Sequence, residues 1–194
     1  MATSVCDYLS AHRVLLSFSI ALMCSFLSAV FGDFPLPTLS FLSDSVPPVT
    51  IDAVLALGIT AATVVSLTAP IAYFEEVASS RWRVADAVLI TVHCAPAFIV
   101  AALALSPTML ARDVAVYFII TILVGALSSM EAGLVVCSLW LVIQSAAYGS
   151  FNDSWAEFFV IILNDSPPFL AWVLAPVVLC LWLILGRPIK LGTA

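Results

Sequence analysis

The fold is decided by residues 114–148, VAVYFIITILVGALSSMEAGLVVCSLWLVIQSAAY. The run is apolar except near its centre, where two serines and Glu131 interrupt it. As a single helix it would be about 50 Å long, whereas the hydrocarbon core of a bilayer is about 30 Å thick. A carboxylate at the middle of a bilayer is also costly. The pattern therefore predicts two short membrane spans, 114–129 and 131–148, joined by a tight turn near Glu131.

The composition of the whole chain supports the same class of protein. Of its 194 residues, 63% are hydrophobic and only 9% are charged, against about 45–50% and about 25% in soluble domains. Helices can satisfy their own backbone groups in lipid, so a bilayer accommodates this apolar surface. Four more apolar runs are of spanning length, at 14–32, 51–74, 84–105 and 168–185. We therefore expect one transmembrane domain over 1–194, an all-α polytopic protein with six spans.

Between the last two spans lies a shorter apolar segment, residues 155–163, WAEFFVIIL. It is too short to cross a bilayer. The Asn-Asp-Ser sequence at 152–154 offers a helix N-cap, and the two prolines at 167 and 168 end the segment. We expect a short interfacial or re-entrant helix here. An ordinary surface helix packed against the bundle fits the pattern equally well.

The cationic residues predict the orientation, because cytoplasmic loops are enriched in Lys and Arg. With six spans and a cytoplasmic N-terminus, five of the six cationic side chains are cytoplasmic: Arg13, Arg81, Arg83, Arg187 and Lys190. Only Arg112 then lies outside, together with most of the aspartates, including Asp52 and Asp113. We therefore predict a multi-pass protein of the cell membrane, with a retained first span and both termini in the cytoplasm.

Polar side chains within the predicted spans are few. His93 is the only ionisable group well inside a span, and Gln144 is the other deep polar residue. No second His, Asp or Glu lies at ligand spacing on the helix of His93, so we expect no metal site. A hydrogen bond from His93 to a nearby carbonyl or to another subunit is the simpler interpretation. Gln144 is expected to link helices through hydrogen bonds.

Several classes of function are not favoured by the sequence. There is no HExxH, no G-x-S-x-G and no glycine-rich phosphate loop. We therefore expect neither enzymatic activity nor a cofactor, and any ATP would be hydrolysed by a separate subunit. No polybasic run is present, so nucleic acid is not an expected partner. The five cysteines form no C-x-x-C pair and are expected to be small buried hydrophobic residues.

The most hydrophilic cytoplasmic segment is 75–83, EEVASSRWR. Its notable side chains are those of Glu75, Glu76, Arg81, Trp82 and Arg83. They could form a docking surface for a cytoplasmic subunit, with Trp82 anchored at the membrane interface. The alternative is a plain loop whose charges only set the orientation.

Together, these features resemble the permease subunits of type-2 ABC exporters. In that family the region between the second and third spans contacts the ATPase, and re-entrant helices precede the last span. Local sequence also resembles small permeases encoded beside ABC ATPases in Gram-positive bacteria, with Pro35-Leu36-Pro37 after the first span and Ala111-Arg112-Asp113 before the fourth. The resemblance covers most of the chain. It implies a cytoplasmic ATP-binding partner, assembly as a homo- or hetero-oligomer with other permease subunits, and export of an amphipathic compound such as an antimicrobial peptide.

Two alternatives remain open at the level of sequence. The substrate-binding membrane components of energy-coupling-factor importers also have six spans, and they dock through small residues in the first span. Ala21, Ser25 and Ala29 have the required four-residue spacing. The chain could instead be a non-transporting accessory subunit of a membrane complex, whose small residues serve only for helix packing.

Overall fold

The computed structural model describes residues 13–32, 34, 50–68, 80–103, 109–147 and 169–185, with the side chains of 80–83, 144–147 and 169–171 excepted. These residues form α2 (Val14–Phe31), α3 (Ile51–Thr68), α4 (Ser80–Ala102), α5 (Met109–Leu127), α6 (Met130–Ala147) and α8 (Phe169–Leu185). The all-α prediction is therefore confirmed for the part of the chain that is described. Helices α2, α3, α4 and α5 are long and apolar enough to cross a membrane. Helices α6 and α8 carry shorter apolar stretches, Met130–Ile143 and Trp172–Leu185.

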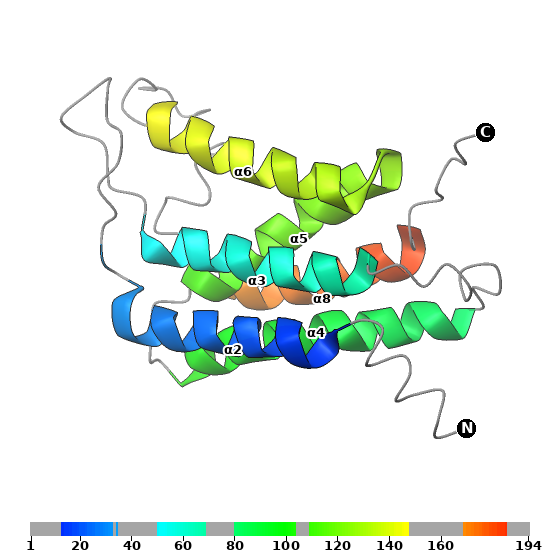
Figure 1. Cartoon of the computed structure of the whole chain (residues 1–194), viewed down its shortest axis with the longest axis horizontal. Helices are drawn as coiled ribbons and strands as arrows, with labels where there is room; N and C mark the ends of the chain where they lie inside the picture. Colours follow the sequence, from blue (N-terminus) through cyan, green and yellow to red (C-terminus); the bar gives the residue numbers. More distant parts are fainter. Residues whose placement is uncertain are drawn as a thin grey trace.

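Successive helices run in opposite directions along the bundle (Figure 1). Helix α2 ends, and α3 begins, at the left-hand end of that view, where α5 also begins. The start of α4 lies at the right-hand end, together with the end of α8. The start of α2 and the end of α8 therefore lie at the same end of the bundle (Figure 1).

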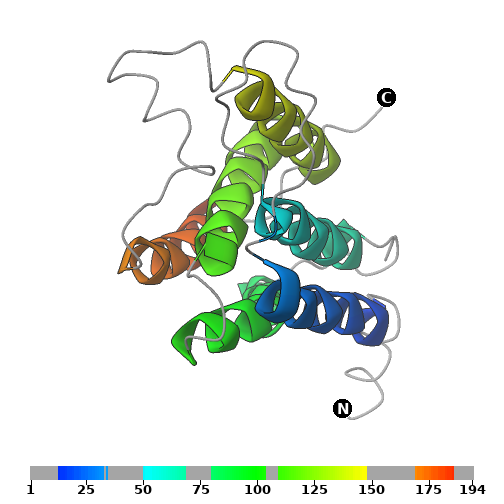
Figure 2. The ribbon, with the colours of Figure 1, turned by 90° about the vertical axis from the view of Figure 1, so that its left-hand side faces the viewer.

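Helix α5 is the centre of the bundle. It packs against α3, α4, α6 and α8, while α2 packs against α3 and α4 on the other side (Figure 2). Most residues in the first two turns of α5 are buried, and so are Tyr117, Phe118 and Ile122 further along. A helix surrounded by others in this way must be apolar on nearly every face, as its sequence is.

The outer surface of the bundle is apolar, and many polar side chains are inside. Leu15 is 83% exposed, Leu127 87% and Ile184 75%. The buried polar and charged residues are Ser17, Ser25, Ser28, Asp52, Thr60, Thr63, Ser66, Asp86, His93, Arg112, Asp113 and Thr121. So much exposed apolar surface is unfavourable in water but is readily solvated by lipid. Together with the four apolar helices, it indicates a protein embedded in a membrane.

The long apolar run of residues 114–148 is divided into α5 and α6, as predicted. The turn lies at Ser128 and Ser129, just before Glu131, because Ser129 caps the second helix. Its Oγ accepts a hydrogen bond from the backbone N–H of Ala132 at 3.1 Å, the bond typical of an N-cap serine. Glu131 lies in the first turn of α6, where a negative charge is favourable.

Close contact between α5 and α6 depends on a glycine. A Cβ atom at Gly133 would lie 2.7 Å from Thr121 Cα and 2.9 Å from Thr121 O. One turn further, Cys137 Sγ lies 3.6 Å from Thr121 Oγ1. Small residues let membrane helices approach closely and gain van der Waals contact. The two short helices therefore form a tight hairpin.

The helix boundaries differ from the predicted spans in ways that matter for function. Helix α5 begins at Met109, ahead of the predicted 114, and so includes Arg112 and Asp113, which we had assigned to the preceding loop. Helix α4 begins at Ser80, ahead of the predicted 84, and so takes in the end of the charged segment. Residues 69–74 of the second predicted span and the predicted short helix at 155–163 lie outside the described residues.

Candidate functional site

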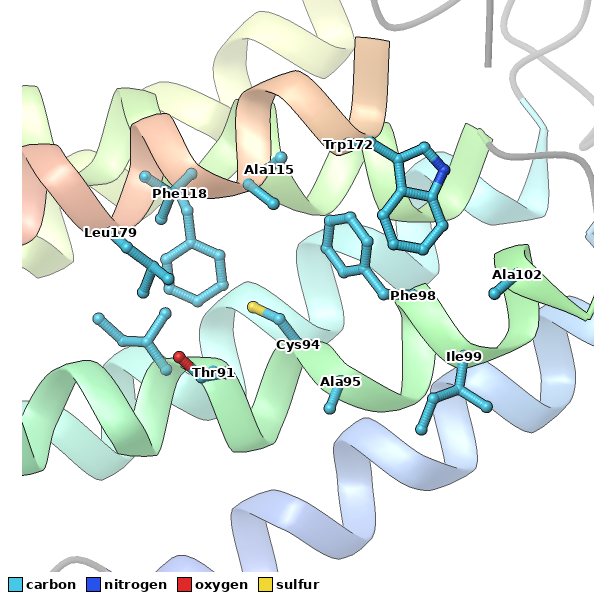
Figure 3. A pocket seen from close by; sticks show the side chains of 13 residues that line it. Thr91, Cys94, Ala95, Phe98, Ile99, Ala102, Ala115, Phe118, Trp172 and Leu179 are labelled. Carbon is cyan, nitrogen blue, oxygen red and sulfur yellow. The ribbon is translucent and has the colours of Figure 1, made fainter. Parts of the chain in front are cut away.

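A cavity lies between α4, α5 and α8 and has a volume of about 370 Å³. It is lined by Ile90, Thr91, Cys94, Ala95, Phe98, Ile99 and Ala102 of α4, Ala115 and Phe118 of α5, and Trp172, Ala175, Val178 and Leu179 of α8. Figure 3 shows side chains of this lining, with Phe98 of α4 next to Trp172 of α8. Ile99 is 56% exposed and Trp172 49%, so the cavity is open at the apolar surface of the bundle.

Two features of the sequence account for a cavity at this place. Alanines at 95, 102, 115 and 175 contribute short side chains from all three walls. Helices α4 and α8 each contain an internal proline, Pro96 and Pro176. A proline has no N–H to donate to the carbonyl oxygen four residues earlier. Helices α4 and α8 therefore each lack one backbone N–H donor next to the cavity.

An aromatic pair connects the two outer walls of the cavity. The rings of Phe98 in α4 and Trp172 in α8 meet edge to face, with centroids 5.4 Å apart and planes at 63° (Figure 3). Such contacts stabilise by about 0.5–1.5 kcal/mol beyond the burial of area. The pair is one of the few links between α4 and α8, because both helices pack more extensively on other neighbours.

The lining of the cavity is almost entirely apolar. Among the described residues that line it, none is charged. Thr91 already donates its hydroxyl hydrogen to Ala87 O at 2.8 Å. The Cys94 sulfur faces the space between α4 and α5 (Figure 3). A ligand here would gain free energy by burying apolar groups and would find few groups to bind a charge.

His93 lies next to the cavity in sequence but on the other face of α4. It is fully buried; its Nδ1 lies 2.8 Å from Leu89 O and its Nε2 2.7 Å from Ser17 Oγ in α2. A carbonyl only accepts, so Nδ1 carries the hydrogen, and the Ser17 hydroxyl donates to Nε2 in the neutral ring. The edge of the Phe18 ring also meets the imidazole. His93 therefore joins α2 to α4, and the expected bond to a nearby carbonyl is present.

The other predicted site residues are only partly described. Arg81, Trp82 and Arg83 are in the first turn of α4, but their side chains lie outside the described part. Glu75 and Glu76 lie outside it altogether. Gln144 is in α6 near its end, and its side chain is likewise not described. The proposed docking surface is thus located only by its connection to α4.

A buried charged cluster that the sequence did not predict lies at the end of the bundle where α3 and α5 begin (Figure 1). Arg112 donates to Asp113 Oδ1 from both Nε and Nη2, each at 2.8 Å. Asp52 of α3 is fully buried and accepts a hydrogen bond from Ser28 Oγ of α2 at 2.6 Å. Asp52 is also close enough to Asp113 for their charges to interact.

The predicted orientation places Arg112, Asp113 and Asp52 on the outer side of the membrane. One signal was available in the sequence: Arg112 and Asp113 are flanked by Ala111 and Val114 within an apolar run. Charged residues next to apolar ones at a helix start can face either solvent or the core. Only the packing of α5 against α3 shows that these are buried.

Neither a metal centre nor a known relative identifies the site. In the described ranges, no three His, Cys, Asp or Glu side chains are grouped so that they could hold a metal ion. No protein family, curated protein or solved structure matches the chain.

Proposed function

We propose that this chain is the membrane-embedded subunit of a transporter for an amphipathic compound. The observation that carries the proposal is the apolar cavity between α4, α5 and α8, which is open at the lipid-facing surface. Its volume of about 370 Å³ falls within the range of small-molecule binding sites, about 300–1,000 Å³. Because the lining offers hydrocarbon and no charge, the bound part of the cargo is an acyl chain or the apolar side chains of a peptide.

Helix α4 supplies the proposed coupling between cargo and energy source. It begins at Ser80, inside the charged segment, and its later turns, from Ile90 to Ala102, line the cavity. A cytoplasmic ATP-binding subunit that moves the start of α4 would therefore move one wall of the cavity. We infer that the docking surface for this ATP-binding subunit is formed by Glu75, Glu76, Arg81, Trp82 and Arg83. The charged segment and both termini would then be cytoplasmic, in a cell-membrane complex that contains further permease subunits.

The importer alternative has less support. The small residues that would serve for docking in the first span include Ala21 and Ser25, which are 0% and 1% exposed. They belong to the face of α2 that packs within the chain, against α3 and α4. Packing within this subunit therefore accounts for Ala21 and Ser25, whereas Ala29 is half-buried.

A cavity-filling substitution tests the proposal. The purified chain is placed in lipid nanodiscs, and binding of a dansyl-labelled amphipathic peptide is followed by fluorescence. Ala175→Phe puts a ring into the cavity and should abolish saturable binding. Val173→Phe is the matched control, because Val173 is on the same helix, 52% exposed and not part of the lining, and it should bind as the parent chain does. Equal binding by all three chains would show that the cavity does not hold the cargo.

A further inference from the structure

The buried pair Arg112–Asp113 uses only one of the two carboxylate oxygens. Arg112 Nε and Nη2 each contact Asp113 Oδ1. Asp113 Oδ2 is buried and has no hydrogen-bond partner among the described residues. The side chain is 1% exposed, so bulk water does not solvate this oxygen. Buried polar atoms in proteins nearly always have a partner, and an exception calls for an explanation such as a bound ion or water.

A second unpartnered oxygen lies on the same face of α5. Tyr117 is four residues after Asp113, and side chains at this spacing are neighbours on a helix. Tyr117 is 0% exposed, and its hydroxyl also has no partner within the described part of the chain. Asp113 is near enough to act electrostatically on Tyr117. Two buried oxygens without a hydrogen-bond partner among the described residues thus belong to side chains one helical turn apart on α5.

The surrounding charges favour a cation in this place. Helix α3 contributes Asp52, whose charge acts on Asp113. Helix α6 contributes Cys137, whose Sγ donates to the backbone carbonyl oxygen of Tyr117 at 3.5 Å. Asp86 of α4 lies in the early turns of that helix, which begins at the opposite end of the bundle (Figure 1). His93 faces α2, and α8 has no charged residue within Phe169–Leu185. Among the described residues the cluster therefore contains two carboxylates and one guanidinium, and like charges in a buried site repel strongly.

We propose that Asp113 Oδ2 and the Tyr117 hydroxyl bind one monovalent cation, H⁺ or Na⁺. As a proton site, Asp113 takes H⁺ from solvent and donates it in a hydrogen bond to the Tyr117 oxygen. As a sodium site, both oxygens are ligands of the ion. In either case the bound cation offsets the repulsion between Asp113 and Asp52, and so stabilises the contact between α5 and α3. The site is at the far end of the bundle from the start of α4, and its existence does not depend on the proposed transport function.

The experiment uses the purified full chain in detergent, without cargo or any partner subunit. Infrared difference spectra between acidic and alkaline buffer detect a protonated carboxyl through its carbonyl stretch. Thermal unfolding in sodium chloride against choline chloride detects Na⁺. Asp113→Asn should remove whichever response the parent chain shows, and Tyr117→Phe should weaken it. Asp86→Asn, a change at another buried aspartate, should leave it unaltered.

Each arm has a decisive outcome. If the parent chain shows a titrating carboxyl band that Asp113→Asn lacks, the bound cation is a proton. If Na⁺ raises the unfolding midpoint of the parent chain but not that of Asp113→Asn, the bound cation is Na⁺. A parent chain with neither response, so that water alone occupies the site, overturns the proposal, as does a response that persists in Asp113→Asn. If Asp113→Asn does not fold, Tyr117→Phe decides, because a folded Tyr117→Phe with the full parental response also overturns it.

Discussion

At the scale of single residues, small and polar side chains specify how the apolar helices meet. Lipid solvates apolar side chains as well as a protein interior does, so helix association depends on close packing and hydrogen bonds. Close packing is seen where Gly133 contacts Thr121, and a hydrogen bond joins Ser17 to His93. The first sets the distance between α5 and α6, and the second joins α2 to α4.

Replacing Gly133 by alanine should destabilise the chain. The new Cβ would meet the backbone of Thr121 at 2.7 Å, which cannot be relieved by rotating a side chain. We expect a loss of about 1–3 kcal/mol of unfolding free energy, typical of overpacking. Gly58→Ala is the control, because its nearest contact would be Cys24 Sγ at an ordinary 3.4 Å. Denaturant unfolding in mixed micelles measures both; equal stability of the two variants would show that α5 and α6 are not in tight contact.

His93→Leu should reduce stability without changing peptide binding. The substitution removes the hydrogen bond with Ser17, which contributes about 0.5–1.5 kcal/mol. The Ser17 hydroxyl can then donate to the carbonyl oxygen of Arg13 or of Val14, at 3.3 and 3.2 Å. Because His93 does not line the cavity, the affinity for the dansyl-labelled peptide should stay that of the parent chain. A large loss of affinity in a stably folded variant would instead place His93 in the binding site.

At the scale of elements, α4 has the most varied sequence. Its first turn contains two arginines, its middle holds His93, and its second half contains Pro96 and most of the cavity lining. Pro96 is tolerated within the helix because neighbouring helices and side chains can compensate freed backbone groups in a membrane protein. A helix that reaches from a charged end to a cavity is suited to transmit movement between them.

Reversing the charges at the start of α4 should separate ATP hydrolysis from transport. Arg81→Glu together with Arg83→Glu inverts the proposed docking surface, so that the ATP-binding subunit no longer moves α4. Transport in proteoliposomes should fall while the ATPase activity of the partner persists. Arg187→Glu with Lys190→Glu makes the same charge change at another predicted cytoplasmic position and should leave transport intact. Coupled transport by the Arg81 and Arg83 variant would disprove the docking assignment.

At the scale of the whole molecule, the bundle reverses the usual distribution of polarity. Exposed leucines, valines and isoleucines surround a centre that contains serines, threonines, His93 and the Arg112–Asp113 pair. Buried polar groups of this kind need partners within the protein, because hydrocarbon offers none. Besides His93, this interior contains four buried charged residues in the early turns of their helices, Asp52, Asp86, Arg112 and Asp113.

Mild-detergent purification of a tagged chain tests the proposed assembly. If the chain is a transporter subunit, a P-loop ATPase should co-purify in stoichiometric amount, identified by mass spectrometry, with activity that depends on this chain. The Arg81 and Arg83 double variant should lose that partner or its stimulation. Purification with structural or redox subunits instead would support the accessory-subunit alternative and remove the transport proposal.

The sequence by itself determined the class and the helices of this protein. Apolar runs of spanning length specify helices because the backbone in lipid must satisfy its own hydrogen bonds, and the serines before Glu131 divide residues 114–148 because they cap a new helix. The cavity, by contrast, is made by residues of α4, α5 and α8 that are far apart in the chain. The burial of Arg112, Asp113 and Asp52 likewise depends on α3 lying against α5. Only the tertiary structure decided these features, because apolar helices have nearly uniform surfaces, and which faces meet is set by packing between helices.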